Sequence, residues 1–390
     1  MNNKFENKRF MKVFGIYFAI LMAFVVVRLV NAYGFFAKLG DELTVDLVST
    51  AIIQIGIMFL VPLFLYMAFF GRSVKQTFSD FKFKKIGIKA IIICFLLGIL
   101  GFVVNLYAST FFSIILTRLG YRYSGGGSSG YDTLPKFLLG ILTVAILPAI
   151  CEEFAHRGLL LQGTRKLWGY KMAIVISSVF FGLMHLNIQQ FFFATVLGIL
   201  MAYVDICAGS ILPSIIMHFM NNFINVFLSY AQSTGLIKFS ISGFLNAIYS
   251  KSVVLFVLFV SFVLFLCLMA ILGLIKLLHK VSLQNKKQEI LMQGFNAQES
   301  DQTKNFQTQS VANLQAEVPM LIENIVEQPA PKHANEEQKK PKAVGEWAEA
   351  YIAPNDSKKI NVSFLEKVPF ILCFVLAIMV TAFTFIWGVI

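Results

Sequence analysis

The sequence predicts an all-α fold, a polytopic transmembrane helix bundle of about eight core helices plus one extra C-terminal helix. Of the 390 residues, 57% are hydrophobic and only 14% are charged, and the mean hydropathy is +0.73. Several apolar runs exceed the roughly 18 residues that suggest a membrane span. Because lipid cannot satisfy open backbone groups, these runs are expected to be helices.

Nine apolar runs are expected to cross the membrane. They cover residues 14–35, 47–70, 88–117, the stretch from 137 to the loop at 163–171, then 172–187, 189–207, 210–231, 252–278 and 365–388. Basic residues gather in alternate loops, which predicts a cytoplasmic N-terminus. The expected location is a multi-pass position in the cell membrane.

Polar segments separate the runs in chain order. The acidic turn 40–46 divides the first two runs, and the basic loop 72–89 precedes the third. A Gly/Ser-rich loop, 121–136, is a flexible linker by its composition. The basic loop 163–171 and the semi-polar loop 232–250 follow, and the second of these is expected at the membrane interface.

The chain divides by composition into three parts. Residues 1–280 are expected to form the transmembrane core, with the chemistry-bearing motifs at 140–230. Residues 281–362 are rich in Gln, Asn, Glu and Lys, which predicts a largely disordered cytoplasmic segment. Residues 363–390 hold the C-terminal transmembrane helix.

Composition also excludes several classes of protein. The net charge is +12, but the basic residues flank the spans and form no basic face with stacking aromatics, so no nucleic-acid partner is expected. The five cysteines lie in apolar runs without a CxxC spacing, which favours small buried side chains over disulfides or thiolate metal sites. They are Cys94, Cys151, Cys207, Cys267 and Cys373.

Four ionisable residues lie close together in the fourth run. Glu152, Glu153, His156 and Arg157 fall within six positions. At membrane depth such groups are expensive unless they pair or line a polar cavity. Glu153 and Arg157, four residues apart, are expected to form an ion pair along one helix face. Pro148 is expected to free a backbone carbonyl beside this cluster and to kink the helix.

Further polar residues are expected to meet this cluster. Glu152 lies 13 residues before Arg165, and His185 lies 14 after Lys171. At about 1.5 Å per residue, both lie roughly 20 Å from the same basic loop. His218 and Asn222 share one face of the seventh run because they are four residues apart.

This set of side chains suits peptide hydrolysis without a Ser or Cys nucleophile. A carboxylate beside His takes a proton from water, and a second His with an amide stabilises an oxyanion. No cofactor is required by this scheme, but Glu152, His185 and His218 are alternatively expected to hold Zn²⁺. The HExxH spacing is absent. His156 is an alternative face-sharing partner of Glu152, and Asp205 is expected to be interfacial.

Three short motifs occur in order, each inside an apolar run: EEFAHR, FGLMH and HFMNN. They resemble the three motifs of the CPBP family, the CAAX proteases and bacteriocin-processing enzymes also called Abi. The resemblance covers about 140–230. The motif residues are Glu152, Glu153, Arg157, Phe181, His185, His218 and Asn222.

The resemblance implies an intramembrane endopeptidase with a bundle of about eight helices. Glu152 would be the general base with His185 beside it, and His218 with Asn222 would form the oxyanion site. Glu153, Arg157 and Phe181 would support them. Family members of the type II CAAX prenyl endopeptidase class remove the last three residues of prenylated proteins, whereas bacterial members include immunity proteins. Both a zinc-dependent and a metal-free glutamate mechanism remain open.

The expected partners are the lipid bilayer and a membrane-associated peptide or lipidated protein substrate. Two other functions remain open. A proton- or ion-coupled transporter also buries Glu and His, although repeat-related halves are not evident. A catalytically silent immunity or scaffold protein would keep the pocket for binding only. The physiological substrate and the oligomeric state are left open.

Overall fold

The computed structural model describes residues 2–122, 131–238, 241–317 and 364–389, and every regular element among them is helical. Contacts divide the chain into two compact units, Met1–Ser282 with Ile352–Ile390, and Leu283–Tyr351. The first unit contains all the predicted site residues. The expected separation into a core, a polar segment and a C-terminal helix stays a prediction.

The first half of the first unit contains long helices interrupted by short segments. In chain order they are α1 (Asn2–Ala32), η1 (Phe36–Lys38), α2 (Glu42–Thr50), η2 (Ala51–Leu60), α3 (Val61–Phe70), α4 (Val74–Asp80) and α5 (Ile88–Arg118). Of these, η2 is a π-helix continuous with α2 and α3. Short α4 begins at a capping box formed by Ser73 and Gln76, within the loop expected at 72–89.

The second half carries the motifs. Its elements are α6 (Leu134–Gly140), η3 (Ile141–Ile146), α7 (Leu147–Glu153), η4 (Phe154–Leu161), α8 (Gln162–Met184), α9 (Ile188–Ala208), α10 (Leu212–Ser233), α11 (Ile241–Lys251), α12 (Val253–Glu317) and α14 (Phe364–Val389). Both η3 and η4 are π-helices on either side of α7. Such wide turns inside α-helices are frequent at functional sites.

Seven stretches among the described residues are long and apolar enough to cross a membrane. One of them, Leu134–Met184, is long enough to contain two of the predicted runs. The chain turns between these two runs at Gly169, which has a φ of +75°. Glycine adopts this left-handed conformation without a steric penalty. A further predicted run corresponds to α10, which is outside the seven. The chain is therefore an all-α, multi-pass integral membrane protein.

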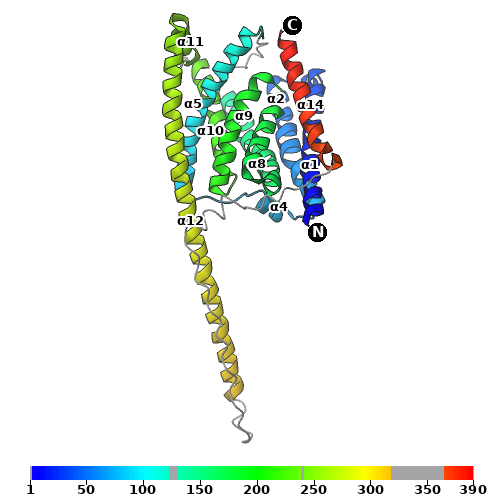
Figure 1. Ribbon diagram of the computed structural model, residues 1–390, viewed down its shortest axis with the longest axis vertical. Coiled ribbons are helices and arrows are strands. Elements are labelled where there is room, and N and C mark those ends of the chain that lie inside the picture. Colours follow the sequence, from blue (N-terminus) through cyan, green and yellow to red (C-terminus); the bar gives the residue numbers. More distant parts are fainter. Residues whose placement is uncertain (1, 123–130, 239–240, 318–363, 390) are drawn as a thin grey trace. The chain divides into compact units, whose positions relative to one another are not determined.

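Three helix pairs organise the first unit. Helix α8 packs on α9, α5 packs on α10, and α1 packs on α14 (Figure 1). One buried cluster joins α1, η2, α7, α8 and α14, and it contains Phe14, Phe154 and Phe180. A second joins α5, α9, α10 and α12 around Leu97 and Met217. The motif helices lie where these two clusters meet.

The outer faces of the helices are apolar. Val254, Leu258 and Phe262 follow one another at intervals of four on α12 and are 69%, 61% and 61% exposed. Residues four apart share one helix face, and a continuous exposed apolar face of this kind is suited to lipid rather than to water. The same holds for Leu365 and Phe383 on α14, which are 77% and 60% exposed.

Two polar stretches are more helical than the sequence predicts. Helix α11 occupies part of the loop expected at 232–250, and α12 continues to Glu317, through the first part of the segment expected to be disordered. Residues 283–317 contain no proline and a single glycine, Gly294, and they are rich in Gln, Lys, Glu and Ala, which favour helix. The remaining part, 318–362, lies outside the described residues.

Candidate active site

A polar cavity of about 460 Å³ lies among α5, η3, α7, α8, α9 and α10. The motif residues that line this polar cavity are Glu152, Phe181, His185, His218 and Asn222. They come from three helices, α7, α8 and α10. The predicted convergence of one carboxylate, two imidazoles and one amide around a single hollow is therefore the arrangement in the structure.

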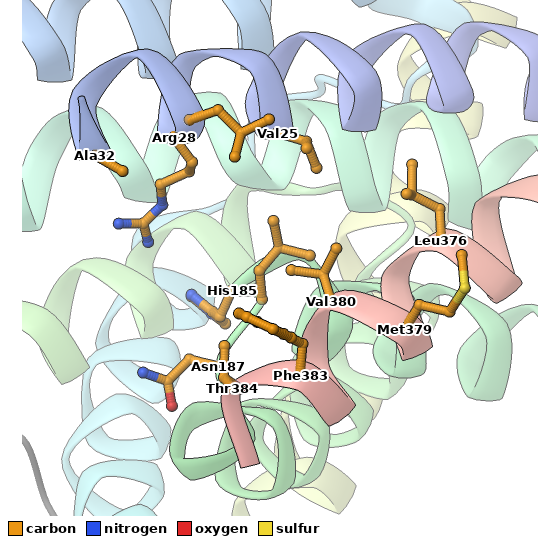
Figure 2. A pocket seen from close by; sticks show the side chains of 12 residues that line it. Val25, Arg28, Ala32, His185, Asn187, Leu376, Met379, Val380, Phe383 and Thr384 are labelled. Carbon is orange, nitrogen blue, oxygen red and sulfur yellow. The ribbon is translucent and has the colours of Figure 1, made fainter. Parts of the chain in front are cut away.

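His185 stands at the end of α8, where the chain turns into α9. The next residue, Leu186, has a φ of +49°, which is uncommon for a residue with a branched side chain. Leu186 is only 7% exposed and belongs to the first buried cluster, so packing holds this strained turn. His185 also lines a second pocket, between α1 and α14 (Figure 2). No hydrogen bond joins His185 to Glu152 within the described ranges.

Glu152 is the last residue but one of α7, and its side chain is partly exposed to the polar cavity. Gln54, from the π-helix η2, donates its Nε2 hydrogen to Glu152 Oε1 at 2.9 Å. Gln54 is only 8% exposed, so this bond fixes one carboxylate oxygen from the side of η2. The sequence reasoning missed Gln54. The sequence does mark Gln54, because it is the one amide side chain in the apolar run AIIQIGIMFL. Polar side chains in membrane helices usually form a hydrogen bond with another helix.

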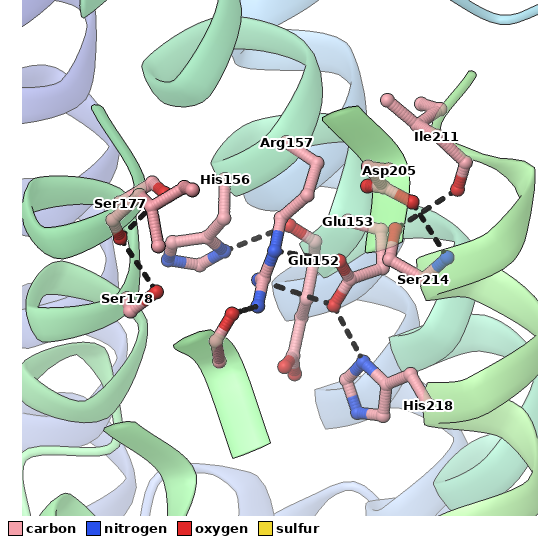
Figure 3. A network of polar contacts seen from close by, with 12 residues as sticks. Glu152, Glu153, His156, Arg157, Ser177, Ser178, Asp205, Ile211, Ser214 and His218 are labelled. Carbon is pink, nitrogen blue, oxygen red and sulfur yellow. Dashed lines mark hydrogen bonds and ion pairs between the residues drawn. The ribbon is translucent and has the colours of Figure 1, made fainter. Parts of the chain in front are cut away.

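Glu153 points away from Glu152 and into the bundle, where it is fully buried. Arg157 Nε lies 3.1 Å from Glu153 Oε2, so the ion pair predicted from their spacing is present. Glu153 Oε1 also lies 2.9 Å from His218 Nδ1 (Figure 3). The sequence reasoning placed His218 with Asn222 alone and missed this bond between α7 and α10.

Arg157 has three kinds of partner. Besides Glu153, its Nη2 donates to the carbonyl of Gly198 at 3.2 Å, and its guanidinium lies 4.5 Å above the ring of Phe181. A Cβ on Gly198 would stand 3.4 Å from Arg157 Nη2 and 3.1 Å from Ser178 Cβ. Only glycine lets α9 approach closely enough for this contact without displacing a neighbour. Arg157 therefore ties η4 to α9.

Phe181 is the centre of the aromatic packing around the site. Its ring centroid lies 5.1 Å from that of His156 and 5.5 Å from those of both His185 and His218. All three contacts are edge-to-face, which is a favourable arrangement for aromatic rings. A single apolar ring thus sets the positions of the imidazoles on α8 and α10.

Asn222 is held on both sides of its amide. Its Nδ2 donates to the carbonyl of Val144 at 2.9 Å, and its Oδ1 accepts from Asn221 Nδ2 at 3.0 Å. Val144 precedes Pro148 by four residues, and Pro148 has no N–H to offer that carbonyl. The carbonyl that the sequence predicts to be free is the one that anchors Asn222. One hydrogen of the Asn222 amide group is left for another acceptor.

His156 faces the first buried cluster and does not line the polar cavity. Its Nδ1 lies 2.7 Å from the carbonyl oxygen of Glu152, and its Nε2 lies 3.0 Å from the hydroxyl of Tyr17 on α1. The carbonyl requires Nδ1 to donate, and the Tyr17 hydroxyl also donates to the carbonyl of Phe180 at 3.2 Å. His156 is 1% exposed. Its role in the structure is to join η4 to α1.

Asp205, which was expected to be interfacial, lies near the end of α9, and its depth in the membrane stays a prediction. It is 2% exposed, and its Oδ1 accepts from the backbone N–H of Ser214 at 2.8 Å. Ser214 lies in the first turn of α10, where backbone N–H groups have no partner within the helix. The carboxylate therefore caps α10 from the neighbouring helix α9, which accounts for its burial.

The zinc alternative requires three side chains that converge on one point. Across the described residues, no group of three or more His, Cys, Asp or Glu side chains is arranged to hold a metal ion. In the expected set of Glu152, His185 and His218, two members already bond to other side chains. The side chains of the described residues, as placed, do not fit a zinc site.

Comparison with known proteins adds an independent observation. Residues 134–224 match the family model described as Type II CAAX prenyl endopeptidase Rce1-like. This range includes every motif residue on α7, η4, α8 and α10. No curated protein and no solved structure matches the chain.

Proposed function

We propose that this membrane protein, whose residues 134–224 match the Rce1-like type II CAAX prenyl endopeptidase model, is an endopeptidase that hydrolyses a peptide bond at or within the bilayer. The observation that carries the proposal is the polar cavity, where Glu152, His185, His218 and Asn222 meet. The same four groups match the requirements of water-based peptide hydrolysis.

In the proposed reaction, Glu152 is the general base. Its carboxylate accepts a proton from a water molecule as the water oxygen attacks the carbonyl carbon of the substrate. Gln54 holds one carboxylate oxygen at 2.9 Å, which leaves the other oxygen for the water. His185, which also lines the polar cavity, orients the same water. Glu152 then returns the proton to the leaving amine.

His218 and Asn222 stabilise the negative charge that develops on the carbonyl oxygen. Asn222 contributes the amide hydrogen that Val144 does not use. His218 directs Nδ1 to Glu153, and its other ring nitrogen points away from that carboxylate (Figure 3). That nitrogen donates to the oxyanion when the ring is doubly protonated. Fixed donors of this kind typically contribute about 10²–10³ in kcat.

Glu153 and Arg157 act as support in this scheme. Both are completely buried, so neither reaches the substrate. Glu153 orients the His218 ring, and Arg157 compensates the Glu153 charge. The two adjacent glutamates therefore have different roles, since one faces the polar cavity and the other faces the bundle.

We further propose that the substrate is a membrane-associated peptide or a lipidated protein. The polar cavity lies inside a bundle whose outer faces are apolar, and the matching family model is described by a prenyl endopeptidase activity. A lipid anchor would bring the peptide to the required depth. The proposed location is the cell membrane with a cytoplasmic N-terminus, which fits the basic residues at 72–89 and 163–171.

The decisive experiment compares two carboxylate-to-amide substitutions. Glu152→Gln is expected to abolish cleavage, whereas Asp132→Asn, at a side chain 55% exposed and outside the polar cavity, is expected to leave cleavage intact. Membrane-proximal fragments are compared by proteomics between cells that carry each variant. If Glu152→Gln protein accumulates normally and every fragment is still produced, the protease assignment fails and a silent binding protein is favoured.

A further inference from the structure

A series of three side-chain amides, Asn105, Asn221 and Asn222, connects α5 to η3 through α10. Asn105, on α5, donates from Nδ2 to Asn221 Oδ1 at 3.1 Å. Asn221 donates in turn from Nδ2 to Asn222 Oδ1 at 3.0 Å, and Asn222 donates to the carbonyl of Val144 at 2.9 Å. Every donor in this amide series therefore points the same way. The series ends at the amide that the proposed reaction uses to stabilise the oxyanion.

The amides meet because α5 and α10 approach each other closely. Asn105 lies seven residues after Gly98, so the two share one face of α5. A Cβ on Gly98 would stand only 2.7 Å from Met220 Cβ on α10, which is too close for two carbon atoms. Glycine at a helix contact lets the two backbones come together, and a side chain as short as asparagine then spans the gap. Asn105 is the one amide side chain in α5, and it is 8% exposed.

Each bond in the amide series fixes the orientation of the next amide. If the Asn221 amide turned over, its NH2 group would face the Nδ2 donor of Asn105, and its oxygen would face the oxygen of Asn222. If the Asn222 amide turned over, its oxygen would face the carbonyl of Val144. The Asn105 donor is therefore what prevents Asn221 from presenting an acceptor, instead of a donor, to Asn222.

Stability alone does not account for an asparagine at position 105. Its Oδ1 is buried and, in the part of the chain that the structure describes, accepts no hydrogen bond. A buried acceptor without a partner is unfavourable, and an apolar side chain of similar size would avoid it. What the Asn105 amide adds is a donor with a defined direction toward α10.

We propose that Asn105 is a positioning residue, which through Asn221 holds the Asn222 amide so that its remaining Nδ2 hydrogen points to the oxyanion. Asn105 acts through Asn221 and not on the substrate. This inference rests on the proposed function and adds α5 to the elements that build the oxyanion site. Because the oxyanion develops only in the transition state, loss of the Asn105 donor lowers kcat and leaves KM unchanged.

The first measurement is a double-mutant cycle for cleavage. Full-length variants in detergent micelles are given an internally quenched, S-farnesylated peptide ending in Cys-Val-Ile-Leu. We expect Asn105→Leu to lower kcat about 10-fold with KM unchanged, the effect of one lost hydrogen bond. Asn105→Ala repeats the measurement with a smaller side chain. In the Asn222→Ala background, either substitution should lower kcat no further, because Asn105 acts through Asn222.

The matched control is Thr110→Val, also on α5. The Thr110 hydroxyl donates to the carbonyl of Leu106 on its own helix at 2.8 Å. The substitution therefore removes one polar group from α5 without touching the amide series, and it should keep the native kcat. A loss equal to that of Asn105→Leu would show a general effect on α5 and would overturn the inference.

The second measurement observes the positioning directly and needs no cleavage. The side-chain amide of Asn222 is followed by NMR in protein that contains isotope-labelled asparagine, and its signal is identified by its loss in Asn222→Ala. Asn105→Leu should shift this signal, whereas Thr110→Val should not. An unshifted signal, or a loss of kcat that multiplies with that of Asn222→Ala, overturns the inference. A shifted signal in Asn105→Leu, together with a native protein that leaves every peptide intact, would instead reject the proposed function.

Discussion

Replacing Arg157 by Met tests whether the buried ion pair is structural. The substitution removes the 3.1 Å contact with Glu153 and the 3.2 Å bond to the Gly198 carbonyl, while the Met side chain keeps most of the volume. Glu153 then stays buried with His218 as its remaining partner. Breaking one side of a buried pair destabilises a protein by about 3–5 kcal/mol. We expect a loss of free energy of unfolding within that range.

The measurement is unfolding of the purified protein in mixed micelles, titrated with a denaturing detergent and followed by Trp fluorescence. Arg72→Met is the matched control, because its pair with Asp80 is exposed, with a side-chain accessibility of 43% for Arg72. Exposed pairs contribute at most about 1 kcal/mol. The double variant Glu153→Leu, Arg157→Met should lose less than the sum of the single losses. A loss for Arg157→Met no larger than that of the control would refute the reasoning.

Three further outcomes follow. Gln54→Leu removes the bond to Glu152, and we expect kcat/KM for cleavage to fall about 10- to 100-fold with normal protein levels; an unchanged value would show that Glu152 needs no such support. Gly198→Ala crowds Ser178 and should lower the free energy of unfolding by about 1–3 kcal/mol, measured by the same detergent titration. Treatment with a chelator should leave the cleavage rate unchanged; a loss restored by zinc would contradict this.

Much of the fold follows from patterns along the chain. Apolar runs of spanning length and basic loops predict a multi-pass helical protein, and four-residue spacings predict the Glu153–Arg157 pair. A free carbonyl near Pro148 was also predictable, since proline has no N–H to donate within a helix. These are local rules, in which each residue and its partner lie within one or two helical turns.

The missed contacts all join residues on different helices. Gln54 meets Glu152 across 98 positions, and His218 meets Glu153 across 65. Asp205 caps a helix other than its own. Periodicity reports which face of a helix a residue occupies, but it does not say which helix lies opposite. The length of α12 was underestimated for another reason, because a polar composition argues against a packed core without arguing against a helix.

The bond between Asn222 and the Val144 carbonyl has a practical consequence for anyone who alters this protein. Any amino acid introduced at position 148 other than proline would add a backbone donor close to this oxygen. The residue at position 148, which touches no reacting atom, would then change how strongly the Asn222 amide is held by the Val144 carbonyl. Substitutions at position 148 would therefore act on the site through the main chain and not through its polar side chains.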